Sequence, residues 1–320
     1  MTAVYITIDT EYAADFAGLG RAENFARSIA CETPSGAVGV FHKMDVMERH
    51  GIRGVFFVDP MPALLYGREA IADVVGPIVE RGHDVQLHCH TEWLALAGAA
   101  SPVRGRSGRN LADFTLEDQQ AILDWARGAL VAAGAPAPVA FRAGNYGAND
   151  DTLRALAAIG LRYDTSHTPG IEGGACRISL ARRHRRPLRH CGVIEVPTGC
   201  IRTLGGRLRH AQVTAISSRE MLAAIRHARD HDLASFTIVS HSFELLCRER
   251  RRANAIVRRR FAALCEGLAS MPGVESATYA SRPPVADAMD APRPVLPVSS
   301  IREGLRIAEQ IIANGLYGAR

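Results

Sequence analysis

The 320-residue sequence contains no long apolar run. No stretch approaches the roughly 18 consecutive apolar residues that cross a bilayer. It also lacks a basic amino-terminal region followed by a small-residue cleavage site, because residues 4–8 already have the pattern of a buried strand. We therefore expect a protein without a membrane span that works in the cytoplasm.

The cysteine pattern excludes a disulfide framework. The chain has seven cysteines, an odd number, with no Cys-x-x-Cys pair. Disulfide scaffolds are typical of much shorter secreted chains. Reduced thiols in a cytoplasm fit this pattern best.

Aromatic residues are few, and none interrupts the basic runs at 182–186, 248–252 and 258–260. With a formal net charge of only +5 and no recognisable nucleic-acid module, the sequence excludes nucleic acid as the expected partner. Two interpretations of the runs stay open: solvated faces of helices and loops, or contacts to an anionic substrate.

Apolar strands alternate with amphipathic helices along most of the chain. Strands are expected at residues 4–9, 54–59, 85–90, 139–142, 161–164, 193–197, 235–241 and 274–278. Helices are expected at residues 38–50, 70–81, 116–133, 150–159, 218–230 and 250–270, and residues 15–35 are expected to form a long irregular active-site loop. This alternation predicts an α/β fold with parallel pairing, and about seven such units in one domain favour a barrel.

The division of the chain follows from its composition. Residues 1–280 are expected to form the single barrel domain, and residues 281–320 a proline-rich arm with a helix at 301–312. That helix is amphipathic, so it would pack on the barrel or on a second subunit, which makes a homodimer compatible with the sequence.

The stretch from Val85 to Trp93 has the spacing of a metal site. Side chains alternate along a strand, so His88 and His90 leave it on the same side, and Glu92 follows at the same interval. Imidazoles and carboxylates are the ligands that a borderline divalent metal such as zinc prefers. The competing interpretation is a pair of histidines in a satisfied polar pocket.

Polar residues also end other predicted strands. In a barrel the carboxyl ends of the strands gather on one rim, where active sites lie. These ends carry acids, imidazoles and an arginine: Asp9, Glu11, His88, His90, Arg142, Asp164 and His241. Such a set suits metal-assisted hydrolysis, in which a carboxylate takes a proton from water, a histidine protonates the leaving amine, and an arginine keeps the base ionised.

Five short motifs in order resemble those of the polysaccharide deacetylases, the NodB-homology hydrolases of the carbohydrate esterase type. They are Thr7-Ile8-Asp9-Thr10-Glu11, His88-Cys89-His90, Phe141-Arg142-Ala143-Gly144-Asn145-Tyr146, Tyr163-Asp164 and Val239-Ser240-His241. The resemblance spans residues 4–278. It implies a distorted (β/α)7, TIM-like barrel, a divalent metal that is usually zinc, and removal of acyl groups from amino sugars.

The resemblance also implies roles for single residues. Asp9 would be the general base, and Arg142 would orient it. His241 would be the general acid, with Asp164 behind it. Tyr146 follows Arg142 as the family's aromatic residue does, and its backbone N–H would help to hold the oxyanion.

Two departures from the family pattern define a variant subgroup. The first motif is Asp-x-Glu rather than two adjacent aspartates, which makes Glu11 the ligand candidate. The second motif is His-x-His, so the metal set is Glu11 and His88 with either His90 or Glu92. We favour His90, because imidazole is the commoner zinc ligand and lies on the same strand face.

Two further residues are candidates for substrate contact. Trp93 would stack on a sugar ring, although tryptophan in such a position more often packs in a core. His167 lies just past Asp164 in the sequence, close enough to reach a substrate.

These observations together predict a metal-dependent hydrolase that removes an acyl group, such as acetyl, from the nitrogen of an amino sugar or glycan precursor. The basic runs would suit anionic groups on that substrate. Two alternatives stay open: a deformylase or cyclic-amide hydrolase using the same site, and a non-catalytic barrel that binds a glycan or partner. Retention of a base, an arginine and an acid argues against a pure binder.

Overall fold

The computed structural model describes residues 1–287 and 294–317. The strands are β1 Thr2–Thr10, β2 Val55–Val58, β3 Asp84–Cys89, β4 Ala140–Ala143, β5 Tyr163–Asp164, β6 Leu188–His190, β7 Val193–Glu195, β8 Cys200–Arg202, β9 Leu208–His210, β10 Ser235–His241 and β11 Val274–Ser276. The α-helices are α1 Arg21–Phe25, α2 Val40–Glu48, α3 Ala63–Tyr66, α4 Arg68–Glu80, α5 Trp93–Ala97, α6 Leu116–Ala132, α7 Asp150–Ala158, α8 Ser218–Asp230, α9 Ala255–Ala269 and α10 Ser300–Tyr317.

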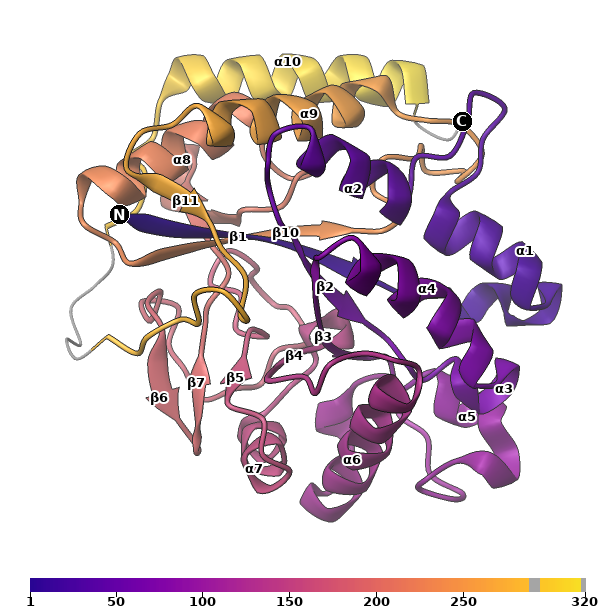
Figure 1. The fold of residues 1–320 in the computed structure, drawn as a ribbon. Helices are drawn as coiled ribbons and strands as arrows, with labels where there is room; N and C mark the ends of the chain where they lie inside the picture. Colours follow the sequence, from indigo (N-terminus) through magenta and orange to yellow (C-terminus); the bar gives the residue numbers. More distant parts are fainter. Residues whose placement is uncertain (288–293, 318–320) are drawn as a thin grey trace.

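The main sheet curls into a distorted barrel with helices on its outside (Figure 1). Its strand order is β10-β1-β2-β3-β4-β5-β7-β6, with β11 also paired to β1. Every pairing along this path is parallel except that of β6 with β7. The seven strands from β10 to β7 are the predicted (β/α)7 arrangement, and the fold prediction is confirmed.

Alternation along the strands separates two apolar layers. On β1 the even-numbered Val4, Ile6 and Ile8 join the large cluster between sheet and helices. The odd-numbered Ala3 and Tyr5 face the interior of the barrel, in a smaller cluster with Phe57 of β2 and others. All nine residues of β1 are buried, which explains why the strand is almost continuously apolar. The same alternation turns Asp9 to the inside.

Most predicted helices begin where a capping residue fixes them. The side chain of Thr115 accepts a hydrogen bond from the backbone N–H of Asp118, and Ser217 caps α8 in the same way through Glu220. The helix expected at 250–270 begins later, because Asn254 caps it by accepting from the backbone N–H groups of Ile256 and Val257. The expected irregular loop at 15–35 is also wrong in part, since it contains α1 and two further short helical turns.

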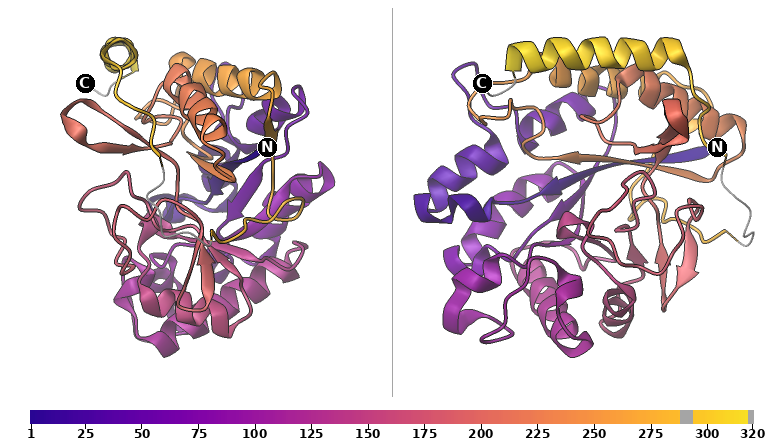
Figure 2. Two further views of the ribbon diagram at one scale, coloured as in Figure 1. Left: turned by 90° about the vertical axis from the view of Figure 1, so that its left-hand side faces the viewer. Right: turned by 180° about the vertical axis from the view of Figure 1, so that it is seen from behind.

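Helix α10 lies along the outside of α8 and α9 (Figures 1 and 2). Its inner face is polar: Arg306 is buried and pairs with Glu220 at 3.1 Å and with Glu303 at 2.9 Å. The helix is longer than the expected 301–312, and several of its apolar side chains are exposed, Ile301 at 76%. The division at residue 280 stays a prediction, and part of the expected arm, 288–293, lies outside the described residues.

No helix within residues 1–287 and 294–317 has both the length and the apolar composition needed to cross a bilayer.

Candidate active site

The predicted functional side chains gather at the carboxyl ends of neighbouring strands. Asp9 of β1 is paired in register with His241 of β10, and His88 of β3 with Arg142 of β4. Because these side chains point toward the inside of the barrel, they form one polar layer at the rim. Glu11 follows β1 directly and joins the same layer.

Glu11, His88 and His90 form a cluster of metal-ligand type. Their ligand atoms all lie within 4.8 Å of one another. The Glu11 carboxylate is 3.1 Å from His88 Nε2 and 2.6 Å from His90 Nε2. The His88 side chain is 2% exposed, whereas those of His90 and Glu11 are 17% and 13% exposed, so the cluster is reached from the rim.

The hydrogen bonds on the far side of each imidazole fix which nitrogen faces Glu11. His88 Nδ1 lies 2.7 Å from the carbonyl oxygen of Arg142, which can only accept, so Nδ1 carries the proton. His90 Nδ1 lies 3.2 Å from the Glu92 carboxylate in the same manner. In the neutral imidazoles both Nε2 lone pairs therefore face a carboxylate, an arrangement that a cation satisfies. This donor set fits a divalent metal.

The electrostatics of the cluster favour positive charge. Burial by itself would lower the pKa of His90, but the carboxylates of Glu11 and Glu92 outweigh it and raise that pKa well above its usual value. Burial would raise the pKa of Glu11, yet the two imidazoles hold it well below its usual value. Because Glu92 supports His90 from behind and accepts from Asn145 at 3.1 Å, the geometry favours His90 over Glu92 as the third ligand.

Asp9 and Arg142 make the ion pair that the sequence predicts. Arg142 Nη1 donates to Asp9 Oδ1 at 2.5 Å, and both side chains are almost completely buried. The guanidinium also lies over the ring of Phe57, 4.5 Å from its centroid. The pKa of Arg142 would be lowered by its burial, but Asp9 and other neighbours raise it. Arg142 is thus a fixed charge that holds one oxygen of Asp9 and leaves the other free to act.

His241 presents its two nitrogens to different acids. Nε2 lies 3.7 Å from Asp9 Oδ2, on the side of the candidate base. Nδ1 lies 3.1 Å from Glu244 Oε1, and Gln212 is also within hydrogen-bond distance. Burial would lower the pKa of His241, but Glu244 and the other acids raise it. The imidazole therefore tends to carry the proton that a general acid needs.

The predicted place of Asp164 behind His241 is wrong. Glu244 occupies it, on the turn after β10 itself. Asp164 ends β5, where its carboxylate accepts from the backbone N–H and the hydroxyl of Ser166, each at 2.9 Å. It lies opposite Glu195 of β7, and burial together with Asp164 raises the pKa of Glu195 well above its usual value. Asp164 thus belongs to a buried pair of carboxyl groups that keeps a proton.

A buried lysine completes the support of the candidate acid. Lys43 of α2 is fully buried and donates to Ser240 Oγ at 2.7 Å, and Ser240 Oγ donates to Glu244 Oε2 at 3.0 Å. Burial lowers the pKa of Lys43 to about 8, against the attraction of Glu244. Burial would raise the pKa of Glu244, but His241, Lys43 and Gln212 bring it to about 2. Glu244 is therefore an anion held between two positive groups.

The sequence predicts no role for Lys43 or Glu244, although the position of each residue in the sequence is unusual. Lys43 is the charged residue among the apolar positions Val40, Met44 and Met47, which share one helix face. Glu244 follows His241 by three residues, a spacing that returns the side chain to the histidine within one turn. A charged side chain that is buried at an apolar position requires a partner, so the position of Lys43 in the sequence predicts one.

Glu244→Gln is expected to shift the alkaline limb of the kcat–pH profile to lower pH. The substitution removes the anion that raises the pKa of His241, so the imidazole loses its proton at a lower pH. The pH profile of kcat, and the imidazole resonances of His241 by NMR, would measure the shift. Glu249→Gln on the exposed segment after it is the matched control. An unchanged alkaline limb would contradict the role of Glu244.

The three substrate-side predictions have different outcomes. Tyr146 lies in the site: it interacts electrostatically with Arg142 and Asp9, and its hydroxyl has no hydrogen-bond partner among the described residues. Trp93 is 1% exposed and packs edge-on against Tyr66, so as a sugar platform it is wrong. His167 is 4% exposed, and its Nε2 contacts the carbonyl oxygen of His184 at 3.1 Å, which leaves no surface for substrate.

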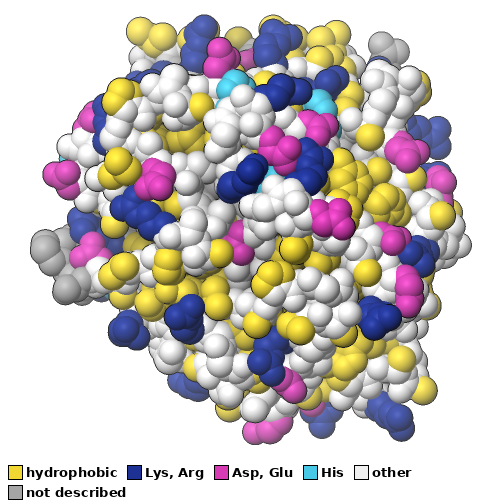
Figure 3. Space-filling model, in the orientation of Figure 1, with side chains coloured by type: hydrophobic (Ala, Val, Ile, Leu, Met, Phe, Trp, Pro, Cys, Tyr) yellow, Lys and Arg dark blue, Asp and Glu magenta, His cyan; other side chains and the backbone are white. Residues whose placement is uncertain are grey.

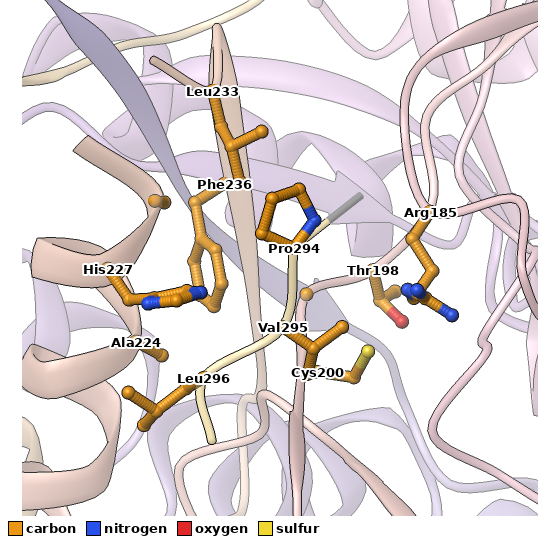
Figure 4. A pocket seen from close by; sticks show the side chains of 12 residues that line it. Arg185, Thr198, Cys200, Ala224, His227, Leu233, Phe236, Pro294, Val295 and Leu296 are labelled. Carbon is orange, nitrogen blue, oxygen red and sulfur yellow. The ribbon is translucent and has the colours of Figure 1, made fainter. Parts of the chain in front are cut away.

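Four hollows among the described residues are lined by none of these residues. In the pocket of Figure 4, residues 294–296 of the C-terminal arm lie between His227 of α8 and Thr198, beside Phe236 of β10. Its lining is mainly apolar, and its free volume is only about 10 Å³, far too small for a sugar. On the face drawn in Figure 3, basic and acidic side chains are interspersed rather than separated. The rim cluster is therefore the candidate site.

Comparison with known proteins gives one family match. Residues 38–163 match the family model described as polysaccharide deacetylase. No curated protein matches the sequence.

Solved structures give the fold over most of the chain. A crystal structure of a putative polysaccharide deacetylase from Mycobacterium smegmatis is 18% identical, with a TM-score of 0.53, and the alignment covers 91% of this chain and 94% of that one. A family 4 carbohydrate esterase from Streptomyces lividans in complex with acetate is 12% identical, with a TM-score of 0.47 and coverage of 89% and 97%. The first of these supports the barrel.

Proposed function

Since residues 38–163 match the polysaccharide deacetylase family model, we propose that the chain is a hydrolase of the deacetylase type, which removes an acyl group from the nitrogen of an amino sugar with the help of a divalent cation. The observation that carries the proposal is the convergence of three groups on one rim. The metal-type cluster of Glu11, His88 and His90 lies beside a base, Asp9, and an acid, His241, that are 3.7 Å apart.

The cation would be held by Glu11, His88 and His90, with zinc as our choice from the two imidazoles and one carboxylate. Bound there, it would supply Lewis-acid chemistry, lowering the pKa of water and polarising a carbonyl oxygen. The chain's own residues supply the proton transfers. Arg142 holds Asp9 Oδ1, so Oδ2 is the oxygen that accepts the proton of the attacking water.

The leaving amine requires a proton, because an amide nitrogen departs poorly as an anion. His241 Nε2 would donate that proton, since Nδ1 is held by Glu244 and Nε2 faces the same space as Asp9 Oδ2. The hydroxyl of Tyr146, which has no hydrogen-bond partner among the described residues, or its backbone N–H, as the family resemblance implies, would contact the acyl oxygen. A base, Asp9, that acts on the water and an acid, His241, that acts on the nitrogen of the amide bond are the two groups that acyl transfer to water requires.

For the substrate we propose an N-acylated amino sugar within a cytoplasmic glycan or glycan precursor. A surface groove of about 420 Å³ lined by five arginines supports anionic groups on the substrate: Arg182, Arg183, Arg185, Arg202 and Arg207. The exposed apolar side chains of α10 support association of two copies.

Metal analysis joined to an assay of amine release tests this function. We expect about one equivalent of a divalent cation in the purified protein, loss of it in His88→Ala, and release of free amine from N-acetylglucosamine oligomers by the wild type but not by His88→Ala. His231→Ala, at the exposed end of α8, is the matched control and should keep both. A wild type that neither contains nor takes up a divalent cation would overturn the proposal.

A further inference from the structure

Asp59 lies between the elements that carry the candidate metal ligands. It follows β2 directly, and β2 separates β1 from β3 in the sheet. The register pairs Thr10 with Val58 and Val58 with Leu87, so the next residue of each strand is at one level: Glu11, Asp59 and His88. The backbone N–H of Asp59 donates to the carbonyl oxygen of Thr10 at 3.0 Å, which continues the ladder to this level.

Alternation also turns Asp59 to the inner face. Phe57, two residues earlier, belongs to the apolar cluster inside the barrel, whereas Val58 belongs to the outer one. Side chains two residues apart on a strand share a face, so Asp59 points the same way as Phe57, into the layer that holds Glu11 and His88.

The carboxyl group of Asp59 is only half satisfied. The residue is 1% exposed. Its Oδ1 accepts from the backbone N–H of Met61 at 3.0 Å, while Oδ2 has no hydrogen-bond partner among the described residues. A buried oxygen of this kind is costly unless a ligand satisfies it, and the groups that act on Asp59 electrostatically include His90, His88 and Glu11.

The charges of this layer leave a place for one more anion. Glu11 supplies one negative charge against the two of a divalent cation, and neutral imidazoles supply none. The charge of Asp9 is already matched by Arg142, and that of Glu244 by Lys43 and His241. Glu92 is 33% exposed at its side chain, so solvent screens it. Among the described residues, Asp59 is the remaining buried carboxyl group that acts electrostatically on both imidazoles.

We propose that Asp59 is a member of the metal centre, an additional anionic partner of the cation beyond Glu11, His88 and His90. The inference rests on the proposed function for the presence of a metal. It identifies a residue that the five motifs do not contain, and it predicts that the centre holds a divalent cation with two carboxylates rather than one.

The test is the affinity of the full-length protein for Zn²⁺, measured by competition with a chromophoric chelator, together with the absorption spectrum of the Co²⁺-loaded protein. Asp59→Asn keeps the shape of the side chain and cannot carry the charge. We expect it to weaken Zn²⁺ binding by about 10- to 100-fold and to change the Co²⁺ spectrum. Asp124→Asn, on the exposed face of α6, is the control and should match the wild type.

The outcomes separate the two proposals. Wild-type protein that binds no Zn²⁺ would overturn the proposed function, and this inference with it. Tight binding by the wild type with equal binding by Asp59→Asn would overturn this inference alone. Circular dichroism of the metal-free proteins, and Asp59→Ala as a second variant, establish that a loss of affinity does not come from a loss of fold.

Discussion

Asp9→Asn is expected to lower kcat by about 10²- to 10⁴-fold, the usual contribution of a positioned general base. The amide keeps the shape of the side chain and a hydrogen-bonding oxygen for Arg142, but it cannot accept the proton of the attacking water. Because Asp9 is not in the cluster of candidate ligands, the metal content of the variant should equal that of the wild type. Steady-state amine release and metal analysis of one preparation measure both quantities.

A matched control is Asp45→Asn, whose side chain is 53% exposed and pairs with Arg81 on the outer surface. It should leave kcat unchanged. Full activity in Asp9→Asn would show that another group takes the proton, and the assignment of the base would be wrong. Loss of metal together with activity would instead place Asp9 among the ligands.

Arg142→Met is expected to lower the free energy of unfolding by about 3–5 kcal/mol, the cost of leaving one member of a buried ion pair without its partner. Arg142 and Asp9 are 0% and 3% exposed, so water does not replace the lost guanidinium. Methionine fills much of the same volume and preserves contact with Phe57, so the loss reports charge rather than a cavity. Chemical denaturation of the metal-free protein measures it.

Two comparisons make this result specific. Arg154→Met breaks an exposed pair with Asp151 and should cost less than about 1 kcal/mol. The double variant Asp9→Asn with Arg142→Met removes both charges, so it should recover part of the stability lost in Arg142→Met alone. A double variant less stable than either single one would contradict the explanation by an unpaired charge.

Local pattern in the sequence determined the barrel and most of the site. Continuous apolar strands such as β1 require burial on both faces, and their alternation with capped helices requires parallel pairing. The two-residue period of a strand places His88 and His90 on one face without reference to any other part of the chain. The same reasoning places Asp9 and Arg142 on one rim; their pairing is what the resemblance to the deacetylase motifs implies, and the structure shows that contact.

Tertiary structure alone decided which groups stand behind the candidate catalytic residues. Asp164 begins a sequence that favours a turn, and it belongs to a family motif. It nevertheless pairs with Glu195, because β5 and β7 are neighbouring strands whose register places these two carboxyl groups opposite each other. Trp93 follows the histidine strand, but the next turn directs it into the core against Tyr66. Neither outcome can be derived from spacing, since each depends on a partner distant in the chain.

Lys43 and Asp59 are two further residues whose surroundings could not be predicted from the sequence. Each is a single charged residue among apolar ones. The sequence shows that this is unusual, but it does not show which distant group the charge meets. Lys43 meets Ser240, almost two hundred residues away, and Asp59 is placed between β1 and β3 by strand register. Local sequence determines the direction of a side chain through backbone periodicity, whereas the charge that it meets there is determined by the packing of distant segments.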